Sequence, residues 1–191
     1  MRKIAIAALA ATSMLALAPS AANASMGERT LAFRGLTLHL PDSWTIYKVH
    51  GGLHVVTGRC AKPKGGFFTP DCRGFWVLGP GAIKYGSEGF GPYKPDRGYY
   101  PASDVEPCPV NGKYWRTGAA GKTVKGYRQV GDGHKAVYRA WPNKCGDQSG
   151  KDTNVRFTQR EWYLPKSKIL IVDDWNTQGL PFILENGEWT A

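Results

Sequence analysis

The four cysteines restrict the fold of this chain more than any other feature. They stand at Cys60, Cys72, Cys108 and Cys145 in a chain of 191 residues that also holds 24 glycines and 13 prolines. An even number of cysteines in an exported chain is typical of disulfide bonds. Of the three pairings, we favour Cys60–Cys72 with Cys108–Cys145, because short-range closure is geometrically easiest.

A zinc site is the alternative use of these cysteines. Structural zinc prefers ligands in pairs of the C-x₂₋₄-C type, and the spacings between these cysteines are much longer. Two disulfides would also leave no cysteine free to act as a catalytic thiol. We therefore predict neither a metal nor any other cofactor.

The N-terminus indicates export. Arg2 and Lys3 precede an apolar run over 4–18, and Ala22-Asn23-Ala24 fits the small-x-small cleavage rule, with Ser25 as the first mature residue. This is the pattern of a secretory signal peptide over 1–24. The apolar run is shorter than the roughly 20 residues of a spanning helix. We predict a secreted, extracellular domain over 25–191 with no membrane span.

The charge of the mature chain points to anionic partners. The formal net charge is +10, and removing the two basic residues of the leader, Arg2 and Lys3, leaves +8. A chain of this length suits one domain. A strongly basic domain favours contact with anionic polymers or acidic surfaces.

Alternating apolar residues predict a mainly β fold. In LTLHL, residues 36–40, three leucines fall on one face and Thr37 and His39 on the other, which is typical of a half-buried strand. Similar runs, rich in β-branched and aromatic residues, lie at 44–49, 53–57, 75–78, 123–130, 135–141, 155–164 and 168–173. We expect an antiparallel sandwich or barrel-like sheet with long ordered loops, and a short helix within 175–184.

Residues 79–112 form the expected binding surface. Glycine and proline interrupt every potential element there, and loops this long in a compact domain are usually functional or disordered. The aromatic residues argue for order, and Cys108 fixes the end of the loop. Tyrosine offers stacking area and lysine or arginine offers charge; the candidate binding residues are Lys84, Tyr85, Tyr93, Lys94, Arg97, Tyr99 and Tyr100. The tyrosines could instead anchor the loop to the sheet.

A hydrolase is the main alternative function. Glycoside hydrolysis needs two carboxylates that converge across a cleft. In the predicted hairpin of 155–164 with 168–173, Glu161 and Asp173 would share one face as diagonal neighbours, provided that the register holds. They are the candidate catalytic residues; pairing with Arg156, Arg160 or Lys168 is the non-catalytic alternative.

The segment CAKPKGGFFTPDC, residues 60–72, has two further interpretations. A disulfide from Cys60 to Cys72 would make it a stapled connection between two strands. A rigid closed loop with an accessible Lys62 or Lys64 would also suit a protease-inhibitor-like module. Phe67 and Phe68 would either tuck under the sheet or face outward.

Two resemblances accompany these patterns. LTLHLPDSW and REWYLP resemble segments of small uncharacterised exported proteins of high-GC Gram-positive bacteria. Leu40-Pro41-x-x-Trp44 is similar to the start of chains in the PsbP/Mog1 group, which implies an α+β sandwich used for binding rather than catalysis. Neither resemblance supplies functional residues.

Together these observations predict a secreted binding domain, with catalysis less favoured. The expected partner is an anionic cell-wall polymer or a protein at the cell surface. Nucleic acid is not expected, because the chain is exported and carries no RNA-binding signature. The sequence predicts no oligomeric state.

Overall fold

The fold was analysed in a computed structural model that describes residues 28–190. The predicted signal peptide, with its cleavage site before Ser25, lies outside the described residues. Within residues 28–190, no helix combines the length and apolar character needed to cross a membrane.

Eleven strands and three short helical segments make up the described chain. The strands are β1 (Glu28–Phe33), β2 (Leu36–Pro41), β3 (Thr45–Val49), β4 (Gly52–Val56), β5 (Gly74–Leu78), β6 (Trp115–Ala119), β7 (Val124–Gln129), β8 (Lys135–Gly146), β9 (Asp152–Leu164), β10 (Ile169–Asp173) and β11 (Glu188–Trp189). The helical segments are α1 (Pro80–Lys84), the 3₁₀ turn η1 (Glu88–Phe90) and α2 (Leu180–Glu185).

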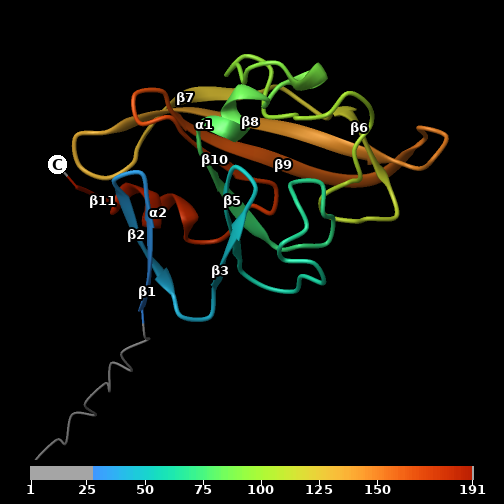
Figure 1. The fold of residues 1–191 in the computed structure, drawn as a ribbon. Helices are drawn as coiled ribbons and strands as arrows, with labels where there is room; N and C mark the ends of the chain where they lie inside the picture. The colour runs from blue at the N-terminus through green and yellow to red at the C-terminus, as the bar shows by residue number, and fades with distance from the viewer. Residues whose placement is uncertain (1–27, 191) are drawn as a thin grey trace, which may run out of the picture.

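The strands form two antiparallel sheets. The smaller sheet has the order β1-β2-β11, and the larger has the order β3-β4-β5-β10-β9-β8-β6, with β7 also paired to β8. Figure 1 shows the long β8–β9 hairpin above the β1–β2 hairpin, with α2 beside the small sheet. The mainly β, antiparallel prediction is confirmed, but the barrel-like alternative is wrong because the sheets do not close.

The main core lies between the two sheets. The inward leucines of β2, which are Leu36, Leu38 and Leu40, pack with Trp162 of β9 and with residues of β4, β5, β10 and α2. Their 0% exposure is what the alternating pattern of LTLHL predicts, because successive side chains of a strand point to opposite faces.

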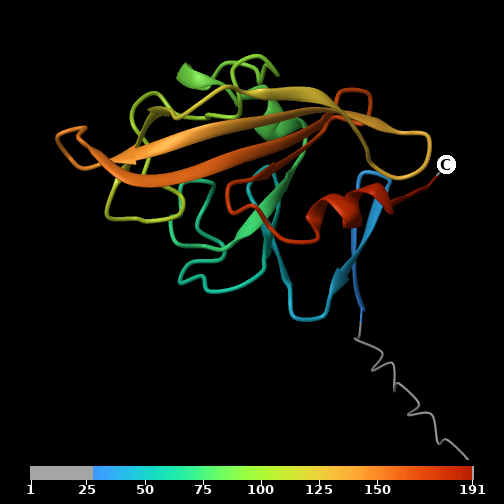
Figure 2. The same cartoon turned by 180° about the vertical axis from the view of Figure 1, so that it is seen from behind.

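The opposite face of the large sheet is covered by residues 79–112. Tyr93 and Tyr99 pack there against Trp76, Leu170 and Val172 of β5 and β10. In Figures 1 and 2 this green segment lies over the sheet, on the side away from the β1–β2 hairpin. The part of the large sheet formed by β5 and β10 is therefore buried on both faces, which explains why every residue of these two strands is buried.

The first hairpin of the large sheet has a turn of two residues. The runs predicted at 44–49 and 53–57 leave 50–52 between them, but β4 begins at Gly52, which pairs with Val49, and His50 and Gly51 make the turn. A Cβ on Gly52 would clash with the carbonyl oxygen of Val77 in the neighbouring strand. Gly52 is thus required by close strand packing, and Gly51 by its φ of 81°.

The sequence patterns missed three strands. Strands β1, β6 and β11 were not predicted, and β8 runs to Gly146, beyond the expected end at Trp141. The first two carry a mostly exposed or half-buried pattern, so they lack the apolar alternation that marks a strand. The helix expected within 175–184 appears as α2, shifted to 180–185.

Candidate functional site

The tyrosines of the predicted binding loop are divided between core and surface. Tyr93 and Tyr99 are only 6% and 4% exposed, so they anchor the loop to the sheet, which is the alternative that the sequence left open for the tyrosines. Tyr100 is half-buried, with the Arg116 guanidinium 5.2 Å from its ring centroid. Tyr85, in contrast, is 48% exposed.

The exposed charges of the loop cancel. Its three predicted basic residues, Lys84, Lys94 and Arg97, are all exposed, but so are three acidic ones, Glu88, Asp96 and Asp104. The loop by itself is therefore not a basic surface. The positive charge that could attract an anionic partner must come from other elements.

Glu161 holds the loop to the sheet. Its fully buried carboxylate accepts hydrogen bonds from the Tyr93 hydroxyl and the Trp141 indole, both at 2.9 Å, and from the Gln159 amide at 2.8 Å. The backbone N–H of Tyr99 donates to it as well. Burial raises the pKa of Glu161, and these four hydrogen bonds act against that rise. Because every contact is internal, we assign Glu161 to the anchoring of the loop.

The end of the loop has its own anchor. Arg116 Nη1 lies 2.6 Å from the buried Glu106 carboxylate. Burial raises the pKa of Glu106, while the Arg116 charge lowers it. Cys108, two residues after Glu106, is bonded to Cys145 of β8. A disulfide and a partly buried ion pair thus fix this end of the loop.

A pH-dependent effect of Glu161→Gln follows from the raised pKa. The folded pKa exceeds the unfolded value of about 4.3, so the contribution of Glu161 to stability is fully present below that value and is lost as pH rises. Glutamine offers one acceptor oxygen in place of two, so at least one of the four donors loses its acceptor, which costs about 1–3 kcal/mol. We expect the stability deficit of Glu161→Gln to be larger at about pH 5 than at about pH 8.

Urea unfolding at both pH values measures this difference. Comparison with the parent protein at each pH cancels the contributions of the other titrating groups to the free energy of unfolding. Glu185→Gln, which changes an exposed glutamate of α2, should show no such pH dependence. A deficit that grows with pH would contradict the assignment.

Asp173 and Glu161 do not form a catalytic pair. Val172 lies opposite Glu161, and Asp173 lies opposite Arg160, which is one residue away from the expected register. Asp173 therefore points to the opposite face of the sheet, where Arg160 Nε donates to it at 2.9 Å. The expectation of a shared face is wrong, because a shift of one residue moves a strand's side chains to the other face.

The 60–72 segment is a closed loop between β4 and β5. Its ends are joined by a Cys60–Cys72 disulfide, the pairing favoured from the sequence. Phe67 tucks inward, with its ring centroid 4.7 Å from that of Tyr99, whereas Phe68, Lys62 and Lys64 are exposed. The inhibitor-like function of the two lysines stays a prediction.

His54 lies beneath this loop. Its Nδ1 donates to the carbonyl oxygen of Pro63 at 2.9 Å, and its ring stacks on Trp76 at 3.9 Å. His54 is fully buried. Burial lowers its pKa. It thus contributes to the packing between the loop and the sheet.

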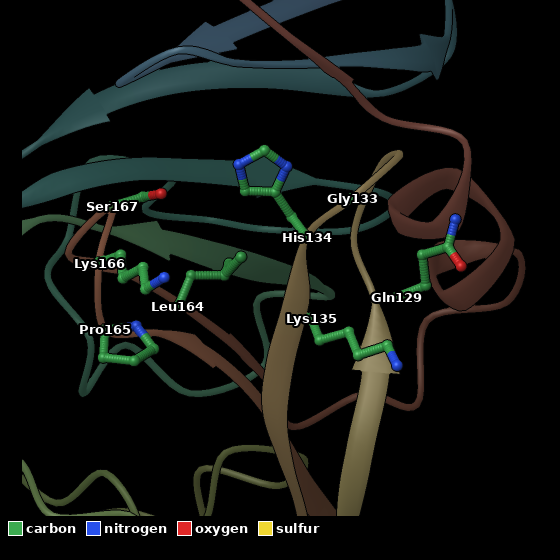
Figure 3. A pocket seen from close by; sticks show the side chains of 8 residues that line it. All are labelled: Gln129, Gly133, His134, Lys135, Leu164, Pro165, Lys166 and Ser167. Atoms are coloured by element: carbon green, nitrogen blue, oxygen red, sulfur yellow. The ribbon is translucent and has the colours of Figure 1, made fainter.

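A pocket of about 430 Å³ lies between the β7–β8 hairpin and the β9–β10 turn, within the usual size range of ligand sites. We call it the hairpin pocket. Its lining residues are Gln129, Gly133, His134, Lys135, Leu164, Pro165, Lys166 and Ser167. Figure 3 shows the residues of the β9–β10 turn on one side and those of the β7–β8 hairpin on the other.

The lining of the hairpin pocket is largely apolar in area and carries two basic side chains. Lys135 and Lys166 supply positive charge, and Gln129 and Ser167 supply hydrogen-bonding groups, with no carboxylate among the lining residues. His134 Nδ1 donates to the Asp132 carbonyl at 2.9 Å, and the ring stacks on Trp189 at 4.1 Å. These contacts hold the imidazole in place at the pocket. Such a lining can bind an anionic group.

A basic face of the sheet continues from this pocket. Gln129 pairs with Lys135, and two residues back along β7 Tyr127 pairs with Val137. A further two residues back, Lys125 pairs with Arg139. Residues two apart share a face of a strand, so Lys125, Tyr127, Lys135 and Arg139 lie on one face. We call these four residues the β7–β8 face.

The β7–β8 face also reaches the predicted binding loop. Arg139 Nε donates to the Pro95 carbonyl at 2.9 Å, which brings the exposed Lys94 beside the face. Tyr127 is 68% exposed. Asp132, near the end of the face, accepts a hydrogen bond from Gln129, and the buried Glu161 of β9 lies opposite Arg139.

Sequence reasoning missed the hairpin pocket and the β7–β8 face. One signal could have drawn attention to the face: residues 107–131 contain five basic residues and no acidic one. The pocket itself joins residues more than 30 positions apart, and no local pattern marks such a site. Among the described residues, no cluster of three or more His, Cys, Asp or Glu side chains suits a metal ion.

Comparison with family models, curated proteins and solved structures found no match for this chain.

Proposed function

We propose that the protein is a secreted module that binds an anionic polymer at the cell surface, through the hairpin pocket and the adjoining β7–β8 face. The observation that carries this proposal is the lining of the pocket, which includes Lys135 and Lys166 along with neutral polar groups and no carboxylate. A net charge of +8 on the mature chain, from which Arg2 and Lys3 are removed, would raise the rate of encounter with such a polymer.

The extent of the basic surface favours a polymer over a small ion. Gln129 follows Lys125 by four positions along β7, which corresponds to about 13 Å along a strand. An extended chain could place one acidic group in the pocket and the following groups along Lys125 and Arg139. The exposed ring of Tyr127 lies between these positions and offers a surface on which a sugar can stack.

The positions of Glu161 and Asp173 favour binding over catalysis by these two carboxylates. Glu161 and Asp173 lie on opposite faces of the sheet, and both carboxylates accept hydrogen bonds from other groups of the protein. The predicted leader, with the two disulfides, supports export to an oxidising environment.

Retention on immobilised polymer tests the proposal. Poly(glycerol phosphate) and polygalacturonate are suitable anionic probes, and dextran is a neutral control. We expect retention at an ionic strength of about 0.01 M and release at about 1 M, because the screening length falls from about 30 Å to about 3 Å. Retention on dextran equal to that on the anionic polymers would contradict the proposal, as would binding unaffected by salt.

A double variant locates the site. Lys135→Ala with Lys166→Ala should weaken polymer binding by about tenfold or more, because contacts between charged groups are lost. Lys48→Ala with Lys113→Ala removes the same charge from exposed positions outside the pocket and the β7–β8 face. Equal losses in both double variants would show that binding depends on total charge, and would overturn the placement in the pocket.

A further inference from the structure

A second groove lies on another part of the molecule, beside the Cys60–Cys72 disulfide. It has a volume of about 730 Å³ and is lined by Arg59, Cys60, Ala61, Asp71, Arg73 and Trp175. We call it the arginine groove. It shares no residue with the hairpin pocket, and none of its residues belongs to the binding set predicted from the sequence.

The two arginines of this groove are held side by side. Arg59 directly precedes Cys60 and Arg73 directly follows Cys72, so the disulfide joins the neighbours of both. The backbone N–H of Arg73 also donates to the carbonyl oxygen of Arg59 at 3.0 Å. A ligand that contacts both side chains therefore finds the backbone already ordered, which reduces the entropic cost of binding.

Arg73 is positioned by its neighbours as well. Its guanidinium carbon lies 5.6 Å from the centroid of the Trp175 ring. Its aliphatic stem lies over Gly58, where an added Cβ would be only 3.0 Å from Arg73 Cδ. Stacking on an aromatic face leaves the edge of a guanidinium available for paired hydrogen bonds to an oxyanion.

The charges of the two arginines are not balanced within the groove. Among residues 28–190, neither guanidinium has a carboxylate within ion-pair distance. Asp71 is the acidic residue in the lining, and its Oδ2 accepts the backbone N–H of Gly112 at 3.0 Å. Asp71 offsets one of the two positive charges of the lining, so one net positive charge remains to be matched by a ligand.

We propose that the arginine groove binds a phosphate monoester carried on a ring. A phosphate monoester bears a charge of about −1.5 to −2 at pH 7 and has three acceptor oxygens. It can therefore pair with both guanidiniums, whereas a carboxylate carries one charge. Trp175 contacts the ring to which the phosphate is attached. This inference goes beyond the proposed function, because the groove, its residues and its ligand differ from those of the hairpin pocket.

Isothermal titration calorimetry of the full mature chain with phenyl phosphate tests this inference. We expect binding of phenyl phosphate, weaker binding of benzoate and of inorganic phosphate, and no binding of phenol. Arg59→Gln and Arg73→Gln should each weaken phenyl phosphate binding by about tenfold or more. Arg73→Lys should weaken it too, because lysine lacks the planar fork of donors.

Two further variants separate the contributions of charge and ring. Arg29→Gln, at an exposed position in β1, should bind phenyl phosphate as the parent does. Trp175→Leu should reduce binding of phenyl phosphate to the level of inorganic phosphate. Unchanged binding in both arginine-to-glutamine variants would overturn the inference, and so would benzoate binding as tightly as phenyl phosphate.

The inference and the proposed function can fail separately. The Lys135→Ala/Lys166→Ala variant should lose the polymer but keep phenyl phosphate, and Arg73→Gln should do the reverse. Loss of phenyl phosphate binding in the lysine double variant would place the phosphate in the hairpin pocket and overturn the assignment to the arginine groove.

Discussion

Replacing Asp173 by alanine is expected to lower the free energy of unfolding by about 3–5 kcal/mol, because it leaves a largely buried Arg160 without its counter-charge. Asp173 is fully buried and the Arg160 side chain is only 12% exposed. The same carboxylate accepts from the backbone N–H groups of Trp175 and Thr177 and from the Thr177 hydroxyl, each at 3.0 Å. The substitution thus removes an ion pair and also the acceptor that closes the turn after β10.

Asp147 offers a matched control. It also accepts hydrogen bonds from a nearby turn, namely from the N–H and hydroxyl of Ser149 and the N–H of Lys151, but its carboxylate is exposed to water. Asp147→Ala should cause a much smaller loss, because water replaces its partners. Urea unfolding measures both variants, and equal losses would contradict the role of burial.

A double variant examines the ion pair further. Arg160→Met in the Asp173→Ala background removes the unpaired charge, so it should recover part of the loss. Recovery should remain incomplete, because the donors of Trp175 and Thr177 stay without an acceptor. A double variant less stable than Asp173→Ala would indicate that Arg160 is well solvated and would refute this explanation.

Replacing Glu161 by alanine is expected to lower the free energy of unfolding by about 3–4 kcal/mol and to loosen residues 79–112. Four donors converge on this carboxylate from Tyr93, Tyr99, Trp141 and Gln159. Two of them belong to the loop and two to the sheet. Alanine leaves all four without their acceptor, and the link between the two layers is lost.

Hydrogen exchange distinguishes loosening of the loop from global destabilisation. In Glu161→Ala, amides of 79–112 should exchange faster than those of β5 and β10, because the sheet keeps its own backbone hydrogen bonds. Glu88→Ala, at an exposed position in the same loop, should leave exchange unchanged. A uniform increase across loop and sheet would show that Glu161 stabilises the whole domain and does not act as an anchor for the loop.

Local sequence patterns predicted the strands that have one clear apolar face or are wholly apolar. Strand β2 follows the leucine alternation of 36–40, and the wholly apolar run at 75–78 became the central strand β5. Polar strands such as β1 and β6 could not be found in this way, because their stability comes from pairing and not from an apolar face. The favoured disulfide pairing agrees with the structure.

The candidate site was much harder to predict. Basic and aromatic residues in 79–112 suggested an exposed binding loop. In the structure Tyr93 and Tyr99 are buried, and the Tyr93 hydroxyl and the Tyr99 N–H both donate to the buried carboxylate of Glu161. Composition cannot distinguish a tyrosine that binds a ligand from one that anchors a loop. Lys135 and Lys166 line one pocket only because the β7–β8 hairpin and the β9–β10 turn lie side by side.

The sequence by itself determined the strand-rich character of the domain, its positive charge and its supply of cysteines, because these depend on residue type and short-range periodicity. The tertiary structure alone decided the register between β9 and β10, and with it the separation of Glu161 from Asp173. It also decided which basic residues line the same pocket. Such relations depend on contacts between segments far apart in the chain, and a shift of one residue in a single strand pair is enough to reverse them.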